Sequence, residues 1–197
     1  MEKFEKFQSR YESGEVPWDY ELPPPELIEL ADQLPAGRVL DLGCGYGRSC
    51  VYLAQKGWQA DGVDFVPLAI EKAEQRLANT AVSHLVNYTV GPVTKIAQAD
   101  QSYDLIVDIG CMHALSADEL QLYAGEVERL LDVNGRYLLF AHILSEGESD
   151  DGSKGITEKT IKDLFANLHL EKVEHGVTQV EDKDPWNSAW FWFIASA

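Results

Sequence analysis

Three glycines and two aspartates carry the residue types and the spacing that a nucleotide-like ligand requires. Gly43, Gly45 and Gly47 lie two residues apart, and Asp41 stands two residues before the first of them, at the end of an apolar run. The segment has the pattern of a buried strand, a tight turn and the start of a helix. Glycines at such a junction let a ligand approach the backbone closely. The spacing predicts a cofactor-binding loop that also includes Cys44.

The spacing of the loop indicates which cofactor it binds. A dinucleotide fingerprint, Gly-x-Gly-x-x-Gly, would place its third glycine where Arg48 stands, whereas here that glycine comes one residue early. A diphosphate gains nothing from a carboxylate at the strand end, but a ligand with an ammonium or sulfonium group does. The pattern therefore favours S-adenosylmethionine over NAD, with Asp41 facing the ammonium. A glycine triplet alone is equally typical of an ordinary tight turn.

Asp64 ends the next expected strand, about twenty residues beyond the first glycine. An acid in this place can accept hydrogen bonds from both ribose hydroxyls. The alternative is that Asp64 caps the following helix, but Pro67 places the cap at Val66, a poor capping residue. We therefore expect Asp64 to be free for the ribose, with Phe65 beside it in the cofactor site.

A polar segment also follows the fourth expected strand. Asp108 and Ile109 are followed by Gly-Cys-Met and His113, at the strand end where open α/β sheets bind ligands. We expect Asp108 to face this crevice, because an unpaired aspartate in a core is costly. His113 has two readings of equal weight: it positions or deprotonates an acceptor, or it is simply hydrogen-bonded within a loop.

Strand and helix signals alternate from residue 38 to about 167, which predicts a mostly parallel sheet with helices on both faces. The last two strand signals follow each other without a helix, so the final strand should run antiparallel to its neighbour. The final strand is apolar on both faces, so it cannot be a solvated edge. The expected strands are 39–42, 58–64, 85–90, 103–108, 136–144, 170–178 and 189–195, and the expected helices are 47–56, 67–77, 117–131 and 157–167.

This pattern resembles the class I S-adenosylmethionine-dependent methyltransferase family, over residues 11–197. The resemblance implies an α/β fold: a Rossmann-like three-layer sandwich whose seven-stranded, mostly parallel sheet has an antiparallel last strand. The family usually has a polar residue after the third strand, which reads the adenine amino group. Pro92 and Val93 stand there instead, so the adenine contact would fall to a backbone group, Gln98 or Asp100.

The first residues point to one branch of the family. The segment Tyr-Glu-Ser-Gly-Glu-Val-Pro-Trp-Asp at 11–19 is similar to the N-terminal signature of thiopurine and tellurite-resistance type small-molecule methyltransferases. The similarity implies that Trp18 covers the cofactor; the alternative is a surface aromatic that anchors the segment. We expect residues 1–36 to form a lid segment with a short helix, and residues 37–197 to form the methyltransferase domain of a single globular protein.

Composition bounds the partners and the compartment. The 197-residue chain has a formal net charge of −17, which disfavours a nucleic-acid substrate. It has no apolar run of membrane-spanning length, and because its first residues lack the apolar segment of a signal peptide, we expect none. Its three cysteines and dispersed histidines fit neither a disulfide framework nor a metal site. We expect a cytoplasmic monomer or homodimer.

These observations together predict a methyltransferase that uses S-adenosylmethionine on a small-molecule acceptor, at a thiol, another heteroatom or a small metabolite. A general base is needed only if the acceptor is protonated at the working pH. Two alternatives remain: a cofactor-sensing protein that keeps the fold without turnover, for which Pro92 gives some room, and a nicotinamide-dependent oxidoreductase.

Overall fold

The computed structural model describes residues 2–144, 155–179 and 185–196. The chain divides into two compact units, Met1–Val93 and Thr94–Ala197. Its strands follow the order β3-β2-β1-β4-β5-β7-β6 in a seven-stranded sheet. The predicted fold class is confirmed, since the sheet is mostly parallel and its last strand, β7, is antiparallel to its neighbours.

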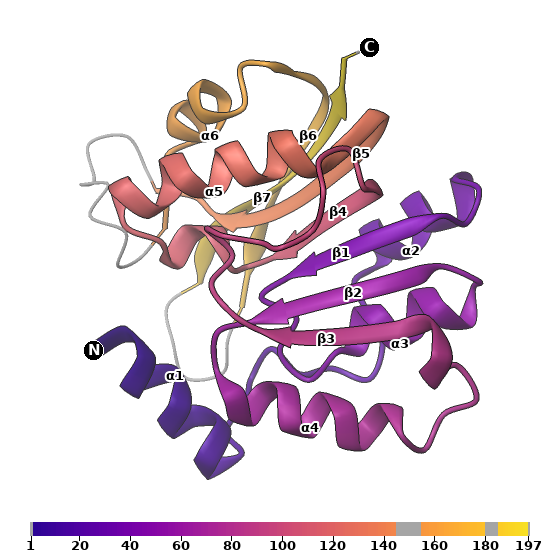
Figure 1. Cartoon of the computed structure of the whole chain (residues 1–197). Coiled ribbons are helices and arrows are strands. Elements are labelled where there is room, and N and C mark those ends of the chain that lie inside the picture. The colour runs from indigo at the N-terminus through magenta and orange to yellow at the C-terminus, as the bar shows by residue number, and fades with distance from the viewer. Residues whose placement is uncertain (1, 145–154, 180–184, 197) are drawn as a thin grey trace. The chain divides into compact units, whose positions relative to one another are not determined.

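The first unit contains three parallel strands with the helices that connect them (Figure 1). The strands pair so that Asp41 lies opposite Gly62 and Asp64 lies opposite Val90. Both carboxylates therefore lie at or next to the carboxyl end of their strand. The elements are α1 (Glu2–Ser13), α2 (Pro25–Gln33), β1 (Arg38–Leu42), α3 (Arg48–Gln55), β2 (Gln59–Asp64), α4 (Pro67–Leu77), η1 (Ser83–Leu85) and β3 (Val86–Val90).

The second unit contains two parallel strands and an antiparallel pair (Figure 1). β7 lies between β5 and β6, antiparallel to both, and its residues from Ser188 to Phe193 are all buried. The apolar character of this strand on both faces is explained by that burial. The elements are β4 (Tyr103–Ile109), η2 (Met112–Ala114), α5 (Ala117–Leu130), β5 (Leu131–His142), α6 (Glu158–Leu164), β6 (Leu168–Thr178) and β7 (Trp186–Ala195).

The predicted helix starts in this unit are confirmed by their caps. Ser116 accepts a hydrogen bond from the Glu119 backbone N–H, while the Glu119 carboxylate accepts one from the Ser116 N–H. The Thr157 side chain accepts from the Thr160 N–H at the start of α6.

Several element boundaries differ from the expectation, most of all that of β5. β5 begins at Leu131 rather than at residue 136, and Asn134 adopts a left-handed conformation (φ 61°) within it. The strand continues through this residue. The helix over residues 2–13 was not predicted as a helix, because its aromatic residues showed only that the segment is folded.

Candidate functional site

The glycine loop owes its shape to backbone conformations that favour glycine. Gly43, Gly45 and Gly47 have φ values of 72°, 55° and 76°, which lie in the left-handed region that other residues rarely adopt. The Gly43 and Cys44 N–H groups both donate to the Val63 carbonyl, at 2.8 and 3.0 Å. The alternating glycine spacing thus reflects alternating left-handed residues in a turn fastened to the end of β2.

Tyr88, on β3, closes one side of this loop. Its hydroxyl donates to the Gly47 carbonyl at 3.2 Å, and a Cβ placed on Gly47 would overlap that hydroxyl. A Cβ on Gly62 would lie 2.7 Å from the Tyr88 ring and 2.9 Å from the Cys44 sulfur. Both glycines are therefore required by the close approach of one tyrosine, which sequence reasoning missed.

Asp64 ties the loop to the start of α4. Its Oδ2 accepts from the Gly45 N–H at 3.0 Å, and its Oδ1 accepts from the Val66 N–H at 2.9 Å. Burial raises the pKa of this carboxyl, while the hydrogen bonds from Val66, Gly45 and Phe65 oppose that rise. The expectation that Asp64 has no role at the helix start was wrong, because it bonds the N–H of the capping residue itself. With three hydrogen bonds accepted, the carboxylate keeps one lone pair for a further donor.

Asp41 is also buried, beneath the loop. The Cys50 thiol donates to its Oδ2 at 3.7 Å. Burial raises the pKa of the Cys50 thiol, and the neighbouring carboxylate raises it further. Cys50 is consequently a neutral packing residue here, and so is Cys44, whose pKa is raised for the same reasons.

The N-terminal segment packs over the middle of the loop. Tyr11 is buried, and its hydroxyl lies 3.2 Å from the position that a Cβ on Gly45 would take; the Trp18 Nε1 lies 4.0 Å from it. Tyr11 also contacts the rings of Tyr46 and Trp18, and Phe7 contacts Trp18 and Phe65. The structure thus brings two of the predicted residues, Trp18 and Phe65, into one cluster beside the loop.

α1 lies beside α4 (Figure 1), and charged side chains of α4 hold the N-terminal segment in place. Arg76 donates to both oxygens of Asp19, at 2.9 and 2.6 Å, in the bidentate geometry that suits a guanidinium and a carboxylate. Lys72 donates to the Tyr11 carbonyl at 3.0 Å and to the Tyr46 hydroxyl at 3.2 Å. These polar contacts add to the aromatic packing and fix the path of the chain past Trp18.

The residues considered for adenine do not converge on one polar group. Pro92 is exposed, and Val93 is buried. Asp100 accepts from Arg129 at 2.8 Å, and the Gln98 carbonyl accepts from the same guanidinium at 2.8 Å. Asp100 is therefore engaged in an ion pair.

Asp108 is fully buried, and the expectation that it faces a crevice was wrong. It accepts from the backbone N–H groups of Cys111 (2.6 Å) and Met112 (2.9 Å) and from the Tyr123 hydroxyl (2.6 Å). Burial raises the pKa of the carboxyl to about 6, against these hydrogen bonds. A buried aspartate is tolerated here because its carboxylate oxygens are hydrogen-bonded. The carboxylate therefore contributes to the fold. Ile109, next to it, is only partly buried.

His113 stacks on His142, with ring centroids 4.4 Å apart and planes inclined by 25°. Burial, together with the smaller effect of the neighbouring His142, lowers the pKa of His113 to about 3, and burial lowers the pKa of His142 to about 4. Both imidazoles are therefore neutral at physiological pH. A base of this strength deprotonates an acceptor poorly.

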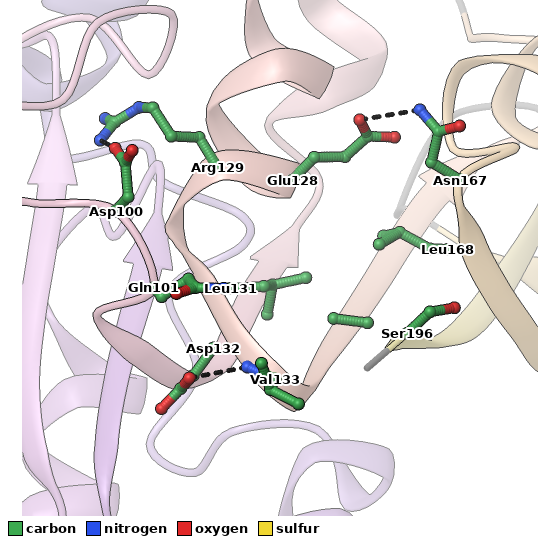
Figure 2. A pocket seen from close by; sticks show the side chains of 11 residues that line it. Asp100, Gln101, Glu128, Arg129, Leu131, Asp132, Val133, Asn167, Leu168 and Ser196 are labelled. Atoms are coloured by element: carbon green, nitrogen blue, oxygen red, sulfur yellow. Dashed lines mark hydrogen bonds and ion pairs between the residues drawn. The ribbon is translucent and has the colours of Figure 1, made fainter.

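A cavity of about 510 Å³ lies elsewhere in the second unit, near the amino end of β5 (Figure 2). Its wall is polar: Glu128 accepts from Asn167 at 3.1 Å, and Arg129 pairs with Asp100. Asp100, one of the residues considered for adenine, lines it, whereas the glycine loop and Asp64 do not. Among the residues that the structure describes, no group of three or more His, Cys, Asp or Glu is arranged for a metal ion, and no helix could cross a membrane.

Comparison with protein families identifies a methyltransferase domain over residues 39–135. One curated relative, the 2-heptyl-1-hydroxyquinolin-4(1H)-one methyltransferase of Mycobacteroides abscessus, is 26% identical over 152 residues, which is 76% of this chain and 66% of that protein. The methyltransferase GfsG of Streptomyces halstedii is 30% identical over 135 residues, 68% of this chain and 47% of that protein. The chain thus spans less than two thirds of either relative.

Solved structures show the same fold. TehB from Haemophilus influenzae superposes with a TM-score of 0.76 at 16% identity, over 98% of this chain and 67% of that one. The Burkholderia thailandensis 1,6-didemethyltoxoflavin-N1-methyltransferase, solved with its acceptor and S-adenosylhomocysteine, superposes with a TM-score of 0.74 at 21% identity, over 98% of this chain and 87% of that one.

Proposed function

Because the chain belongs to the class I S-adenosylmethionine-dependent methyltransferase family, we propose that it transfers a methyl group from S-adenosylmethionine to a small-molecule acceptor. The observation that carries the proposal is the glycine loop joined to Asp64. Three left-handed glycines give the loop a tight turn that carries no side chain of its own at these positions, and a buried carboxylate at the end of the next strand keeps a lone pair for a hydroxyl donor.

The side chains of the first unit have the chemical character that each part of this cofactor requires. Asp64 would accept from a ribose hydroxyl, and Asp41 would complement the ammonium of the methionyl end. Tyr11 and Trp18 lie beside Gly45 and supply an aromatic cover. Phe65, Pro92 and Val93 offer apolar surface for the adenine, whose amino group would be read by backbone. When bound, S-adenosylmethionine supplies an electrophilic methyl carbon on a sulfonium leaving group.

The contribution of the protein is then alignment and exclusion of water. Holding two reactants in line contributes about 7–11 kcal/mol in favourable cases. Bound S-adenosylmethionine would supply the methyl group in a single displacement, in which the acceptor lone pair would form the new bond and the electron pair of the broken carbon–sulfur bond would go to sulfur. The proposed acceptor is a thiol, another heteroatom or a small metabolite. Two of the relatives described above are named for heteroaromatic acceptors, while other methyltransferases of similar sequence or fold are named for ajmaline and geranyl diphosphate.

The proposal also covers the partners, the compartment and the oligomeric state of the protein. A net charge of −17 opposes binding to a phosphate backbone, so we propose that nucleic acids and membranes are not its partners. The proposed compartment is the cytoplasm, and the proposed state is a monomer or homodimer.

Thermal unfolding in the presence of ligands tests the cofactor assignment. A ligand at a hundredfold excess over its dissociation constant stabilises the folded state by about 2.7 kcal/mol. We expect S-adenosylhomocysteine to raise the melting temperature and NADH to leave it unchanged. The reverse result would identify a nicotinamide enzyme and overturn the proposal.

Turnover separates an enzyme from a cofactor sensor. Purified protein with labelled S-adenosylmethionine would be screened against thiols, phenols, N-hydroxy heteroaromatics, amines and halides. Transfer of label to an acceptor supports the proposal. Binding of S-adenosylhomocysteine without transfer to any of them would favour the sensor.

A further inference from the structure

Two stacked histidines lie where two parallel strands of the second unit end. His142 is the last residue of β5, and His113 lies in η2, the short turn that follows β4. Their rings are 4.4 Å apart and nearly parallel. Ligands of open α/β sheets bind outside the carboxyl ends of the strands, so the position of this pair is that of a ligand site and not of a core.

Aromatic rings continue the surface around the pair. Trp186 meets the His142 ring edge-on at 4.3 Å, and Phe140 lies 5.7 Å from it. Trp186 is 37% exposed, while Phe140 and both histidines are partly buried. A partly exposed group of four rings presents flat apolar faces together with polar nitrogen edges, which suits a planar ligand that stacks and hydrogen-bonds.

The polar atoms of the pair are only partly used within the protein. The backbone N–H of His142 donates to the Nδ1 of His113 at 3.5 Å, which places the His113 proton on Nε2 as a donor. The Nδ1 of His142 is buried and has no hydrogen-bond partner among the described residues. A buried polar atom without a partner is rare and costly in a native structure, so a bound group that completes its hydrogen bonding would account for it.

We propose that His113, His142, Phe140 and Trp186 form the acceptor subsite, and that its substrates are planar aromatic compounds whose nucleophilic heteroatom is held, and not deprotonated, by the imidazoles. The inference rests on the proposed methyltransferase function and names its substrate class. The acceptor brings its own lone pair, as a thiolate, an acidic phenolate or oxyanion, or an unprotonated ring nitrogen. The methyl group is then transferred to that lone pair, and no proton has to be removed by the protein.

The neutral state of both rings supports the proposal that they hold the acceptor and do not deprotonate it. Their pKa values of about 3 and about 4 leave each imidazole uncharged, so the pair solvates an anionic or neutral heteroatom without first releasing a proton of its own. Asp108 and Tyr123 are also near β4 in this unit, but they hydrogen-bond each other and the backbone of residues 111 and 112. The polar groups of these two side chains are therefore already used within the protein.

Binding is tested first, with the complex of the full chain and S-adenosylhomocysteine. Thiophenol and cyclohexanethiol form one pair of probes that differ in planarity, and 4-nitrophenol and phenol form a second pair that differ in acidity. The imidazole C–H resonances of His113 and His142, assigned from His113→Phe and His142→Phe, should shift on addition of the planar probes. If no planar probe moves them while S-adenosylhomocysteine binds normally, the subsite is elsewhere and the inference is overturned.

Kinetics then test the role of the pair. His113→Phe and His142→Phe keep a stacked ring but lose a nitrogen, and we expect each to reduce kcat/KM for the methylated planar probe roughly tenfold to a hundredfold, with the affinity for S-adenosylhomocysteine unchanged. The exposed His84 provides the control, since His84→Phe should change neither quantity. If both site variants were as active as the wild type, the assignment of the subsite would be refuted. If the wild type itself did not bind S-adenosylhomocysteine, the proposed function would be refuted instead.

The pH profile separates holding from deprotonation. If the acceptor arrives ionised, the acid limb of kcat/KM follows the acceptor and lies at lower pH for 4-nitrophenol than for phenol. A limb at the same pH for both phenols would show that a protein group removes the proton. Methylation of cyclohexanethiol at the rate of thiophenol would exclude a site that selects planar compounds.

Discussion

The backbone N–H of Gly45 donates a 3.0 Å hydrogen bond to the Oδ2 of Asp64, joining the turn after β1 to the end of β2. The other oxygen of the same carboxylate accepts from the Val66 N–H at the start of α4. One buried side chain thus fixes both the loop and the helix start. This arrangement means that Asp64 serves the fold and the proposed cofactor site together.

Replacement of Asp64 should separate these two roles. Asp64→Ala leaves two buried N–H groups without partners, which costs about 1–3 kcal/mol each, and removes the proposed ribose contact. We expect no measurable binding of S-adenosylhomocysteine by calorimetry. Asp64→Asn keeps one acceptor and should retain the fold with affinity reduced at least tenfold.

The exposed Asp32 supplies a control with the same change of charge. Asp32→Asn should keep both wild-type stability in urea and wild-type affinity. Wild-type affinity in Asp64→Ala would show that the ribose is bound by another residue.

The contact between Gly47 and Tyr88 yields a second prediction. An alanine at position 47 would be strained by its left-handed backbone, at about 1–2 kcal/mol, and would overlap the Tyr88 hydroxyl, which adds about 1–3 kcal/mol. We expect Gly47→Ala to lower the free energy of unfolding by roughly the sum of the two effects and to weaken S-adenosylhomocysteine binding.

Combining this change with Tyr88→Ala isolates the overlap. The double variant should lose less stability than the two single variants added together, because the collision disappears and only the backbone strain remains. A Cβ on Gly125, in α5, would meet nothing within 4 Å, so Gly125→Ala should be neutral or slightly stabilising. Strict additivity of the Gly47 and Tyr88 changes would show that the two residues do not interact.

The sequence was sufficient for the loop because its glycines, Asp41 and Asp64 are local signals: a backbone conformation demands a residue type at a fixed spacing. The same holds for the capping box at Ser116 and Glu119. The burial of Asp108 was not predictable in this way. Its partner Tyr123 lies fifteen residues later on a helix, and the local pattern does not show that such a hydroxyl comes within reach. The contact between Tyr88 and Gly47 could not be predicted from the sequence for the same reason. Only the pairing of the strands brings the two residues together.

The buried Asp108 carboxylate leads to a third prediction. Its two oxygens accept three hydrogen bonds, from two backbone N–H groups and from Tyr123. An asparagine has one acceptor oxygen, so its amide group would face a donor. We expect Asp108→Asn to lower the free energy of unfolding by about 2–4 kcal/mol, measured by urea denaturation.

Tyr123→Phe provides the comparison, because it leaves the two backbone hydrogen bonds to Asp108 in place and removes only the contacts of the Tyr123 hydroxyl, with Asp108 and with the Tyr137 hydroxyl. Its cost should be smaller than that of Asp108→Asn. If both variants were as stable as the wild type, the network would contribute nothing to folding.

The stacked histidines and Asp108 should give opposite contributions to stability in mild acid. The unfolded chain binds protons on histidine near pH 6.5, whereas folded His113 and His142 stay neutral down to about pH 3 and 4. The unfolded state therefore binds more protons in this window, and stability falls as the pH is lowered from 6.5, by up to about 1.4 kcal/mol per pH unit for each imidazole. Asp108 has the opposite effect: its pKa is raised to about 6 in the folded state, so its contribution to stability grows as the pH falls from 6 toward 4.

Urea denaturation midpoints measured between pH 7.5 and 4.5 test both effects. As the pH is lowered, His113→Phe should lose less stability than the wild type, and Asp108→Asn should lose more. Identical slopes in all three proteins would mean that neither the imidazole nor the carboxylate changes its pKa on folding.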